Sequence, residues 1–208
     1  MDQLTNLAIA GGLAWASGIR LYAVLFILGL VGRLKLFDWQ IPASLDVLSH
    51  PFVLATTGVL LFLEFFADKI PGLDSIWDAI HTFVRIPAGA LLAMGAMGQQ
   101  DSAAWAIVVG LVGGTITAGT HFTKAGTRAL LNTSPEPVSN VTASVTEDAA
   151  VLGGLWLAFA NPVVFLLLLA LFILVVIWVL PKIWRLIKYI VNRIIAFVSG
   201  APQPVRPV

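Results

Sequence analysis

The stretch that decides the fold is AAVLGGLWLAFANPVVFLLLLALFILVVIWVLP, residues 149–181, which contains 33 residues and not one charged side chain. A helix needs about 20 apolar residues to cross a hydrocarbon core about 30 Å thick. As one straight helix this stretch would be about 50 Å long, which is more than one crossing requires. Asn161-Pro162 is the expected break, because proline disfavours helix at the preceding residue and cannot donate to the preceding turn. The stretch therefore predicts one full span over 162–180, with a shorter helical segment before it.

The whole chain has a membrane-like composition. Of its 208 residues, 59% are hydrophobic and 11% are charged, against about 45–50% and about 25% in soluble domains. Four more stretches reach or approach the length of a span: 7–31, 51–70, 74–98 and 102–123. The segment 145–160 gives only about 24 Å of helix, which is short of a crossing unless it tilts or is re-entrant. We therefore predict an all-α integral membrane protein with five to six transmembrane helices in one membrane domain, residues 1–181.

Basic residues concentrate at the C-terminal end. Residues 1–148 carry 7 basic and 11 acidic side chains, whereas residues 149–208 carry 5 basic and none acidic. Over 182–199 the basic and apolar side chains separate onto opposite sides of a helix, which is typical of an amphipathic interfacial helix on an anionic leaflet. We expect it to bind anionic lipid head groups through Lys182, Arg185, Lys188 and Arg193. Residues 200–208 are expected to be disordered, and the net charge of +1 gives no sign of a nucleic-acid partner.

The two halves of the chain resemble each other. Three pairs of segments match in the same order, at separations of 107 to 111 residues: 17–20 with 125–128, 50–54 with 161–165, and 76–85 with 183–193. A duplication explains these matches, although Gly, Pro and Trp also recur wherever membrane helices end. Three crossings would separate equivalent segments, so we predict two inverted repeats, about 5–98 and about 102–181. Secondary transporters are often built this way, with their site near the bilayer midplane.

The orientation follows from where Lys and Arg flank the spans. Arg33 and Lys35 follow the first span, and the basic tail follows the last. Both groups are cytoplasmic if an odd number of crossings separates the termini. We therefore expect an N-out, C-in arrangement in the bacterial inner membrane, with 145–160 not crossing.

Several ionisable side chains fall inside the predicted spans, where each costs about 2.5–3.5 kcal/mol on insertion scales. Arg20 has 17 uncharged residues before it and 12 after it, which predicts a pairing or functional role. The alternative is a helix that starts at Arg20 and leaves 4–17 at the interface. Glu64 and Asp68 share one helix face, where paired carboxylates suit proton carriage or cation binding, although Asp68 could instead lie at the water interface.

Two further segments carry a polar arc. The first arc holds Asp74, Asp78, His81, Thr82 and Arg85, and it forms either an amphipathic lead-in on the membrane surface or the wall of a pathway. The second gathers threonines with three side chains that could hold an anion: His121, Lys124 and Arg128. Ser144 and Glu147 have the spacing of a capping box. Glu147 and Asp148 therefore belong to the first turn of a helix or pair with one of the buried arginines, Arg20 or Arg128.

No motif indicates an enzyme or a metal centre. The chain has no cysteine, no His-Glu-x-x-His, no Gly-x-Ser-x-Gly and no phosphate-cradling glycine loop. We therefore expect no catalysis, no cofactor and no metal. The expected substrate or ion pathway consists of the ionisable side chains of the spans: Arg20, Glu64, Asp68, Asp78, His81, Arg85, His121, Lys124, Arg128, Glu147 and Asp148.

Two parts of the chain resemble a known family. The run Leu-Glu-Phe-Phe-Ala-Asp-Lys-Ile-Pro-Gly at 63–72, with Thr-Phe-Val-Arg at 82–85, forms the first part. Lys-Ala-Gly-Thr-Arg-Ala at 124–129, continuing through Pro-Val-Ser-Asn at 137–140 to Glu147-Asp148, forms the second. Together they resemble the bacterial membrane family catalogued as domain of unknown function 4126, over about residues 5–180. The resemblance implies a multi-pass membrane protein and adds no substrate.

The function predicted from these features is a small secondary transporter or channel-like protein for a small charged solute, with His81 and His121 as proton-responsive groups. The alternative is a non-transporting membrane scaffold or assembly factor whose buried ion pairs fix helix packing. The basic tail suggests a third class, a lipid-handling protein. The lipid bilayer and a second copy of the chain are the expected partners.

Overall fold

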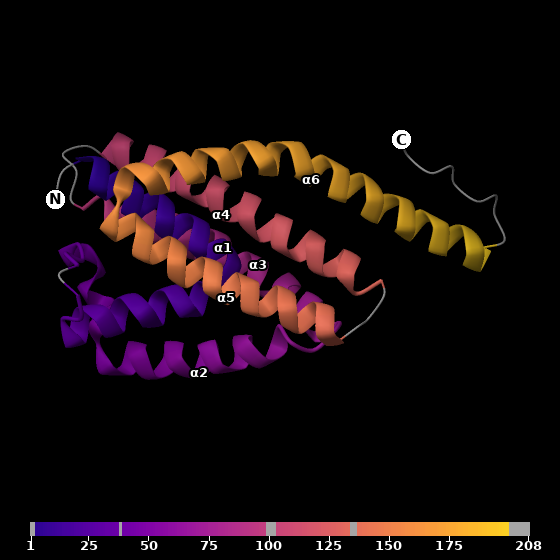
Figure 1. Ribbon diagram of the computed structural model, residues 1–208, viewed down its shortest axis with the longest axis horizontal. Coiled ribbons are helices and arrows are strands. Elements are labelled where there is room, and N and C mark those ends of the chain that lie inside the picture. The colour runs from indigo at the N-terminus through magenta and orange to yellow at the C-terminus, as the bar shows by residue number, and fades with distance from the viewer. Residues whose placement is uncertain (1–2, 38, 99–102, 134–136, 200–208) are drawn as a thin grey trace.

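The computed structural model describes residues 3–37, 39–98, 103–133 and 137–199. Over these residues the fold is all-helical and contains no strand. The elements lie along one long axis (Figure 1), and their order is α1 (Gln3–Leu34), the 3-10 helix η1 (Ala43–Ser49), α2 (Pro51–Ala67), α3 (Leu73–Ala96), α4 (Ala103–Leu131), α5 (Pro137–Ala160) and α6 (Pro162–Ser199).

By length and composition alone, and with α1 counted over its whole length, four helices could cross a membrane: α1, α3, α4 and α6. The pair η1 and α2, which are bent by 70°, makes a fifth if it counts as one span. Large apolar side chains cover the outside of the bundle, including Phe83 at 84% exposure and Leu167 at 68%. A lipid environment accommodates such a surface, so the fold is consistent with an integral membrane protein.

The helix α1 folds back on itself at Arg20, whose backbone (φ −142°, ψ 75°) is not helical. Gly12 lies against Ala158 near the end of α5, while Arg20 bonds to Ser144, more than two turns earlier in α5. After the break the chain returns, because Trp39 stacks on Phe159. Figure 1 shows both ends of α1 at the same end of the bundle. The single span expected over 7–31 is therefore wrong.

The two halves of α1 are short. They contain 17 and 14 residues and are about 25 and 21 Å long, so neither spans a hydrocarbon core of about 30 Å. Residues 8–10 and 12–14 of the first half are buried, which also rules out an interfacial position for this segment. The apolar core lies between the two halves and the C-terminal part of α3, with Ile9, Leu13, Leu28, Leu92 and Ala96 among its residues.

The first half of α1 and α4 lie side by side in the same direction. The hydroxyl of Thr117 donates to the carbonyl of Ala14 at 2.8 Å, and further along Lys124 donates to that of Ile19 at 3.1 Å. Gly18 permits this approach, because a Cβ there would lie 2.6 Å from the carbonyl oxygen of Thr117. The matched segments 17–20 and 125–128 thus belong to helices of one direction, and the inverted arrangement predicted for them is wrong.

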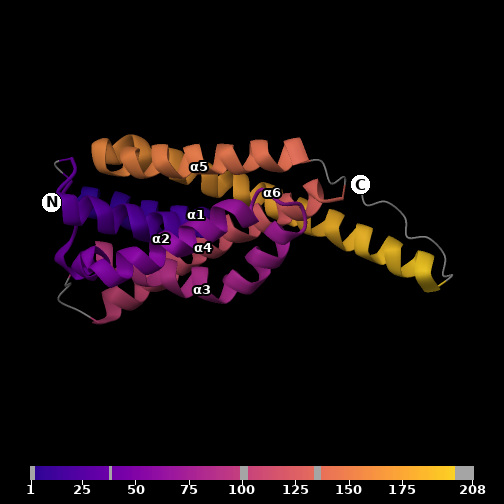
Figure 2. The same ribbon diagram turned by 90° about the horizontal axis from the view of Figure 1, so that it is seen from below.

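The fold-back also separates the two basic segments. Arg33, in the last turn of α1, lies at the end of the bundle that holds the N-terminus, whereas the C-terminal half of α6 extends beyond the opposite end (Figure 2). The expectation that both basic segments share one side of the membrane is therefore wrong, because α1 returns to the end where it began.

The break at Asn161-Pro162 is confirmed, since α5 ends at Ala160 and α6 begins at Pro162. The polar stretch before residue 145 differs from the expectation, because α5 already begins at Pro137 and its 24 residues measure about 36 Å. Pro137 takes the first helical position, where its missing N–H costs nothing. The predicted interfacial helix is the continuation of α6 through Pro181, held against α4 by the contact of Ile183 with Gly126. The expected disordered tail, 200–208, lies outside the described residues.

Candidate functional site

A network of buried ion pairs connects five helices. At its deep end, Glu64 of α2 accepts a hydrogen bond from Arg85 of α3 (Oε1–Nη2, 2.6 Å). Arg85 also donates to Asp78, which lies about two turns earlier on α3, at 2.8 Å. The ammonium of Lys124, on α4, lies 3.4 Å from Asp78 and 2.7 Å from Asp68. Acidic and basic groups therefore alternate along the network, so that each charge has an opposite charge as its neighbour.

Arg20 continues the network from the fold-back of α1. Its guanidinium pairs with Asp68, and its Nε lies 2.8 Å from a carboxylate oxygen of Asp148 on α5. Its Nη2 also donates to the hydroxyl of Ser144 at 2.7 Å. Arg20 is 1% exposed, and the break in the helix directs it toward α2 and α5 together.

Arg128 forms the outer end of the network. It binds Glu147 of α5 through two bonds (2.9 and 3.1 Å), and its Nη1 lies 3.9 Å from Asp74 of α3. Two amides extend this end, because Asn132 donates to Asp74 at 2.7 Å and accepts from Asn140 at 3.0 Å. The ion-pair network, defined by the alternating ion pairs, comprises Glu64, Arg85, Asp78, Lys124, Asp68, Arg20, Asp148, Glu147, Arg128 and Asp74, with Lys69 beside Asp148.

His121 lies beside the deep end as a neutral imidazole. Arg85 approaches its Nδ1 at 3.3 Å, and Thr82 approaches its Nε2 at 2.7 Å. Because a guanidinium can only donate, Nδ1 accepts, and Nε2 carries the hydrogen that it donates to the threonine hydroxyl. The hydroxyl in turn donates to the carbonyl of Asp78 at 2.9 Å.

His81 lies at the flank of this arrangement. Its ring stacks on Trp77 with centroids 4.0 Å apart, meets the edge of Tyr22, and bonds through Nδ1 to the carbonyl of Trp77 at 2.8 Å. The other ten of the eleven residues predicted for the pathway take part in the ion pairs and hydrogen bonds described above, and Glu147 joins the outer end to Arg20 and Lys124 at 3.7 Å each. The polar arc of α3 faces the bundle interior, and the alternative of a surface lead-in is wrong, because Asp74, Asp78 and Arg85 are all buried.

Sequence reasoning assigned no site role to Asp74, Asn132, Asn140 and Ser144. Asp74 shares its helical arc with Asp78, so that signal was present. Asn140, Ser144 and Asp148 recur at four-residue spacing, which places them on one helix face. The spacing becomes informative only once α5 is known to start at Pro137. The capping role considered for Ser144 and Glu147 is excluded, because both lie well inside α5 and Glu147 pairs with Arg128.

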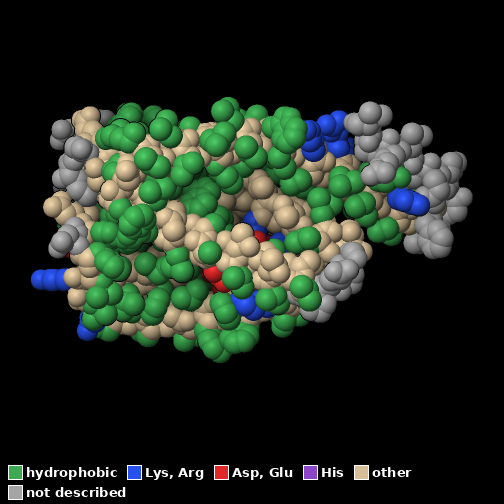
Figure 3. Space-filling model, viewed as in Figure 1, with side chains coloured by type: hydrophobic (Ala, Val, Ile, Leu, Met, Phe, Trp, Pro, Cys, Tyr) green, Lys and Arg blue, Asp and Glu red, His purple; other side chains and the backbone are tan. Residues whose placement is uncertain are grey.

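The network can be reached from one side. Asp148 and Glu147 keep 29% and 19% of their side chains exposed. A groove of about 540 Å³ between α1, α2 and α5 has Arg20 and Asp148 at its polar end and apolar walls that include Phe26, Phe62 and Leu152. Figure 3 shows acidic and basic side chains in the middle of an otherwise largely hydrophobic face. In the described part of the chain, no group of three or more His, Asp or Glu could hold a metal ion.

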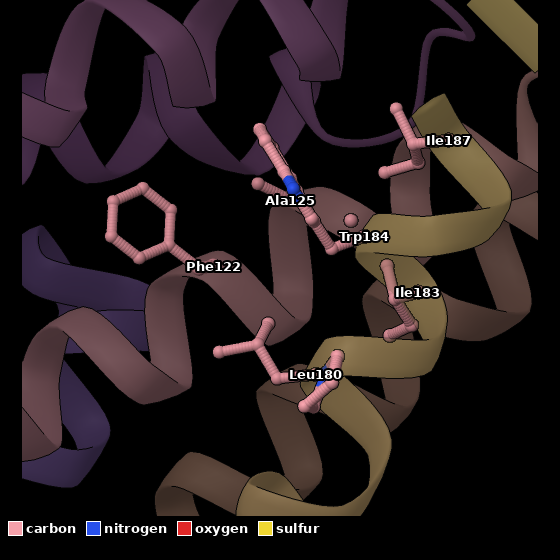
Figure 4. A pocket seen from close by; sticks show the side chains of 8 residues that line it. Phe122, Ala125, Leu180, Ile183, Trp184 and Ile187 are labelled. Atoms are coloured by element: carbon pink, nitrogen blue, oxygen red, sulfur yellow. The ribbon is translucent and has the colours of Figure 1, made fainter. Parts of the chain in front are cut away.

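A second groove, of about 630 Å³, lies between α4 and α6. Figure 4 shows Phe122 on one side, with Leu180 and Ile183 on the other, lining it with apolar groups. Lys182 lies between two of the lining residues in the sequence, and its ammonium lies over the ring of Trp178.

The long apolar helices and the buried ion pairs between them define the class of the protein. It is all-helical over the described residues and compatible with a membrane. The chain belongs to the family described as Domain of unknown function (DUF4126), whose model matches residues 7–182. The matched region contains every residue of the ion-pair network and ends where the basic part of α6 begins. No curated protein and no solved structure matches the chain.

Proposed function

We propose that this protein is a small secondary transporter or channel-like protein for a small charged solute. One observation carries the proposal: the ion-pair network runs from the turn between α4 and α5 to Glu64 in the interior, with Arg20 at a helix break. Ionisable groups inside a membrane domain are costly and mark substrate or ion pathways. Interrupted helices are likewise typical of transporter sites, because their ends provide free backbone groups for ligands.

The break in α1 provides such a group. The carbonyl of Ile19 stands at the end of the first half of α1 and accepts a bond from the ammonium of Lys124. A solute ion could compete for this carbonyl and for Asp68, which the same ammonium contacts. The site would thus combine backbone and carboxylate ligands at one place.

The two ends of the bundle differ in polarity. The network approaches the end near Asn132 and Asn140, whereas Ile9, Leu13 and Leu92 fill the bundle on the side of the N-terminus. In this conformation a solute would reach the network from the first end and be stopped by the apolar core. Transport would require the apolar side to open, as in alternating access.

The distribution of basic residues supports an N-out, C-in orientation. Arg33 and Lys35 lie at the N-terminal end, but four basic residues follow residue 181 in the helix that extends from the other end. The side with more Lys and Arg near the spans is normally cytoplasmic. In this orientation Lys182, Arg185, Lys188 and Arg193 would contact the anionic lipids of the bacterial inner membrane.

The test is to reconstitute the purified protein in liposomes and record solute-driven currents on a solid-supported membrane, over anions, divalent cations and small metabolites. Arg20→Lys keeps a positive charge but removes the fork that joins Asp68, Asp148 and Ser144. We expect a current with at least one solute that this variant loses. The matched control is Arg33→Lys, at an exposed arginine outside the network. Folded protein that gives no current with any solute would overturn the proposal.

A membrane scaffold is the second candidate, favoured by the way the network links α1, α2, α3, α4 and α5. Exchanging the charges of Arg128 and Glu147 distinguishes the two functions. Under either one the double variant should fold better than each single variant, because opposite charges still face each other. A transporter should also lose its current, whereas a scaffold has none to lose.

A further inference from the structure

The ion-pair network contains unequal numbers of positive and negative groups. Its cations are Arg20, Lys69, Arg85, Lys124 and Arg128, and its carboxylates are Glu64, Asp68, Asp74, Asp78, Glu147 and Asp148. With every group ionised, the described network would hold one uncompensated negative charge. An uncompensated charge inside a membrane domain is strongly unfavourable, so one positive charge is needed for balance.

The histidines do not provide that charge. His121 accepts from Arg85 at Nδ1 and is therefore neutral. His81 stacks outside the network, against the ring of Trp77. A proton on one of the carboxylates is the remaining source within the described contacts.

Five of the six carboxylates have two or more cations within 4 Å or accept several hydrogen bonds. Asp68 contacts the two cations Arg20 and Lys124. Asp78 contacts the two cations Arg85 and Lys124. Asp74 accepts from the backbone N–H groups of residues 72 and 75 and from the amide of residue 132. Such bonds stabilise a carboxylate.

The other two of these five lie nearer the surface. Glu147 has two bonds to Arg128 and keeps 19% of its side chain exposed. Asp148 lies 2.8 Å from Arg20 and keeps 29% exposed. Both therefore have more than one cation within 4 Å, which favours the ionised form.

Of the six carboxylates, Glu64 has the weakest stabilisation of a negative charge by its neighbours. It is fully buried and contacts a single cation, Arg85, which it shares with Asp78. Its Oε2 has no hydrogen-bond partner, as is also true of one carboxylate oxygen in each of Asp68, Asp74 and Asp78. The charged or titratable groups that face it are Tyr22 and Arg20 on α1, Asp68 at the end of its own helix, Arg85 on α3, and Lys124 on α4. Each of the three cations among them pairs with at least one other carboxylate.

From this geometry we infer that Glu64 binds one proton at neutral pH, which balances the charge of the network. Resting on the proposed function, the inference also makes this proton the coupling ion. Glu64 lies at the deep end of the network, where the pathway meets the apolar core. A proton released there changes the charge of the interior by one unit, and that change would favour rearrangement of the helices around it.

Infrared spectroscopy of the protein in lipid nanodiscs at neutral pH tests the proton site directly, because a protonated carboxyl has a C=O stretch distinct from that of a carboxylate. We expect one such band per chain, shifted in heavy water and lost in Glu64→Gln. The matched control is Asp46→Asn, at an exposed carboxylate in η1, which should keep the band. A band that survives in Glu64→Gln, or the absence of any band in the wild type, would overturn the inference.

Thermal unfolding provides a second criterion. Glutamine resembles a protonated glutamate in shape and charge, so Glu64→Gln should unfold within a few degrees of the wild type. Asp68→Asn removes an ionised group between two cations and should unfold well below it. Equal losses in the two variants would contradict the inference. Neither measurement depends on transport, so a missing current would overturn the proposed function and leave the proton site standing.

Discussion

The ammonium of Lys124 lies 3.1 Å from the carbonyl oxygen of Ile19, the last residue before the fold-back of α1, and 2.7 Å from the carboxylate of Asp68. One side chain of α4 thus binds the last carbonyl of a half-helix and neutralises the acid that directly follows α2. The C-terminal end of a helix carries partial negative charge and free carbonyls, which a cation stabilises. The fold-back and the ion-pair network are therefore parts of the same construction.

Lys124→Met should destabilise the protein by about 3–5 kcal/mol, because it leaves Asp68 with one cation and the carbonyl of Ile19 without a donor. Urea unfolding in mild detergent measures the loss. The control is Lys35→Met, at an exposed lysine outside the network, which should change stability by less than about 0.5 kcal/mol. Equal effects of the two substitutions would contradict the assigned role of Lys124.

The close contact of α1 with α4 can be tested at Gly18. A Cβ there would lie 2.6 Å from the carbonyl oxygen of Thr117 and 2.7 Å from the Cβ of Thr120. Gly18→Ala should therefore cost about 1–3 kcal/mol through overpacking. Gly153→Ala is the matched control, since nothing lies within 4 Å of a Cβ at that position in α5. It should be neutral or slightly stabilising, because alanine is the better helix former.

The fold-back itself is accessible to labelling, because the chain contains no cysteine. Single cysteines at Leu4 and Leu36, both exposed, should react with a membrane-impermeant maleimide from the same side of the membrane. A cysteine at Thr133, at the opposite end of the bundle, should react from the other side. If positions 36 and 133 react from one side of the membrane and position 4 reacts from the other, α1 crosses the membrane and the fold-back is contradicted.

Asn132 joins three helices at the outer end of the network. Asn132→Ala removes its bonds to Asp74, Ser75 and Asn140, and a buried polar group left without its partner costs about 1–3 kcal/mol. Hydrogen exchange should become faster in the first turns of α5, which lose one of their links to the end of α4 and keep the bond from Arg128 to Asn140. Thr133→Ala serves as the control, because its hydroxyl bonds to the local carbonyl of Leu130 in α4. Unchanged exchange in α5 after Asn132→Ala would show that the amide does not hold this end.

The basic part of α6 should select anionic lipids. Brominated lipids quench tryptophan emission, and Trp178 and Trp184 are both well exposed on this helix. Each lysine near an anionic surface contributes about 1 kcal/mol, so Lys182→Gln with Lys188→Gln should markedly reduce the preference for brominated phosphatidylglycerol over phosphatidylcholine. Lys35→Gln, at the other end, should leave it unchanged. An undiminished preference in the double variant would exclude lipid selection by these lysines.

The sequence was most informative about the lengths of the helices and about which charged side chains would be costly to bury. Apolar length identified the long helices, and Asn161-Pro162 marked a real boundary. The high cost of burying a charge pointed to Arg20, Glu64 and Arg85 before any contact was known. Neutral amides such as Asn132 and Asn140 cost far less to bury, so composition did not distinguish them from a surface loop.

The fold-back at Arg20 could not be predicted, because a single non-helical residue leaves the hydrophobic pattern on either side unchanged. No proline stands near the break, and Gly18 also fits a simple packing role. This error led to two others. Counting α1 as one crossing placed Arg33 at the wrong end and made the matched segments inverted. The start of α5 was missed for a different reason. The helical segment was expected to begin at residue 145, although a proline such as Pro137 is favoured at the first position of a helix.

The position of Arg20 also bears on how the protein is made. Its partners Asp68 and Asp148 follow it by 48 and 128 residues in the sequence, and a ribosome adds about 5–20 residues per second. The first helix of the chain therefore leaves the ribosome roughly 6–25 s before the last acid that neutralises it. For most of that interval Asp68 is the one acidic partner available to Arg20, and its full set of partners exists only after α5 has been made. We therefore expect the hairpin of α1 to take its final place in the bundle only when α5 arrives.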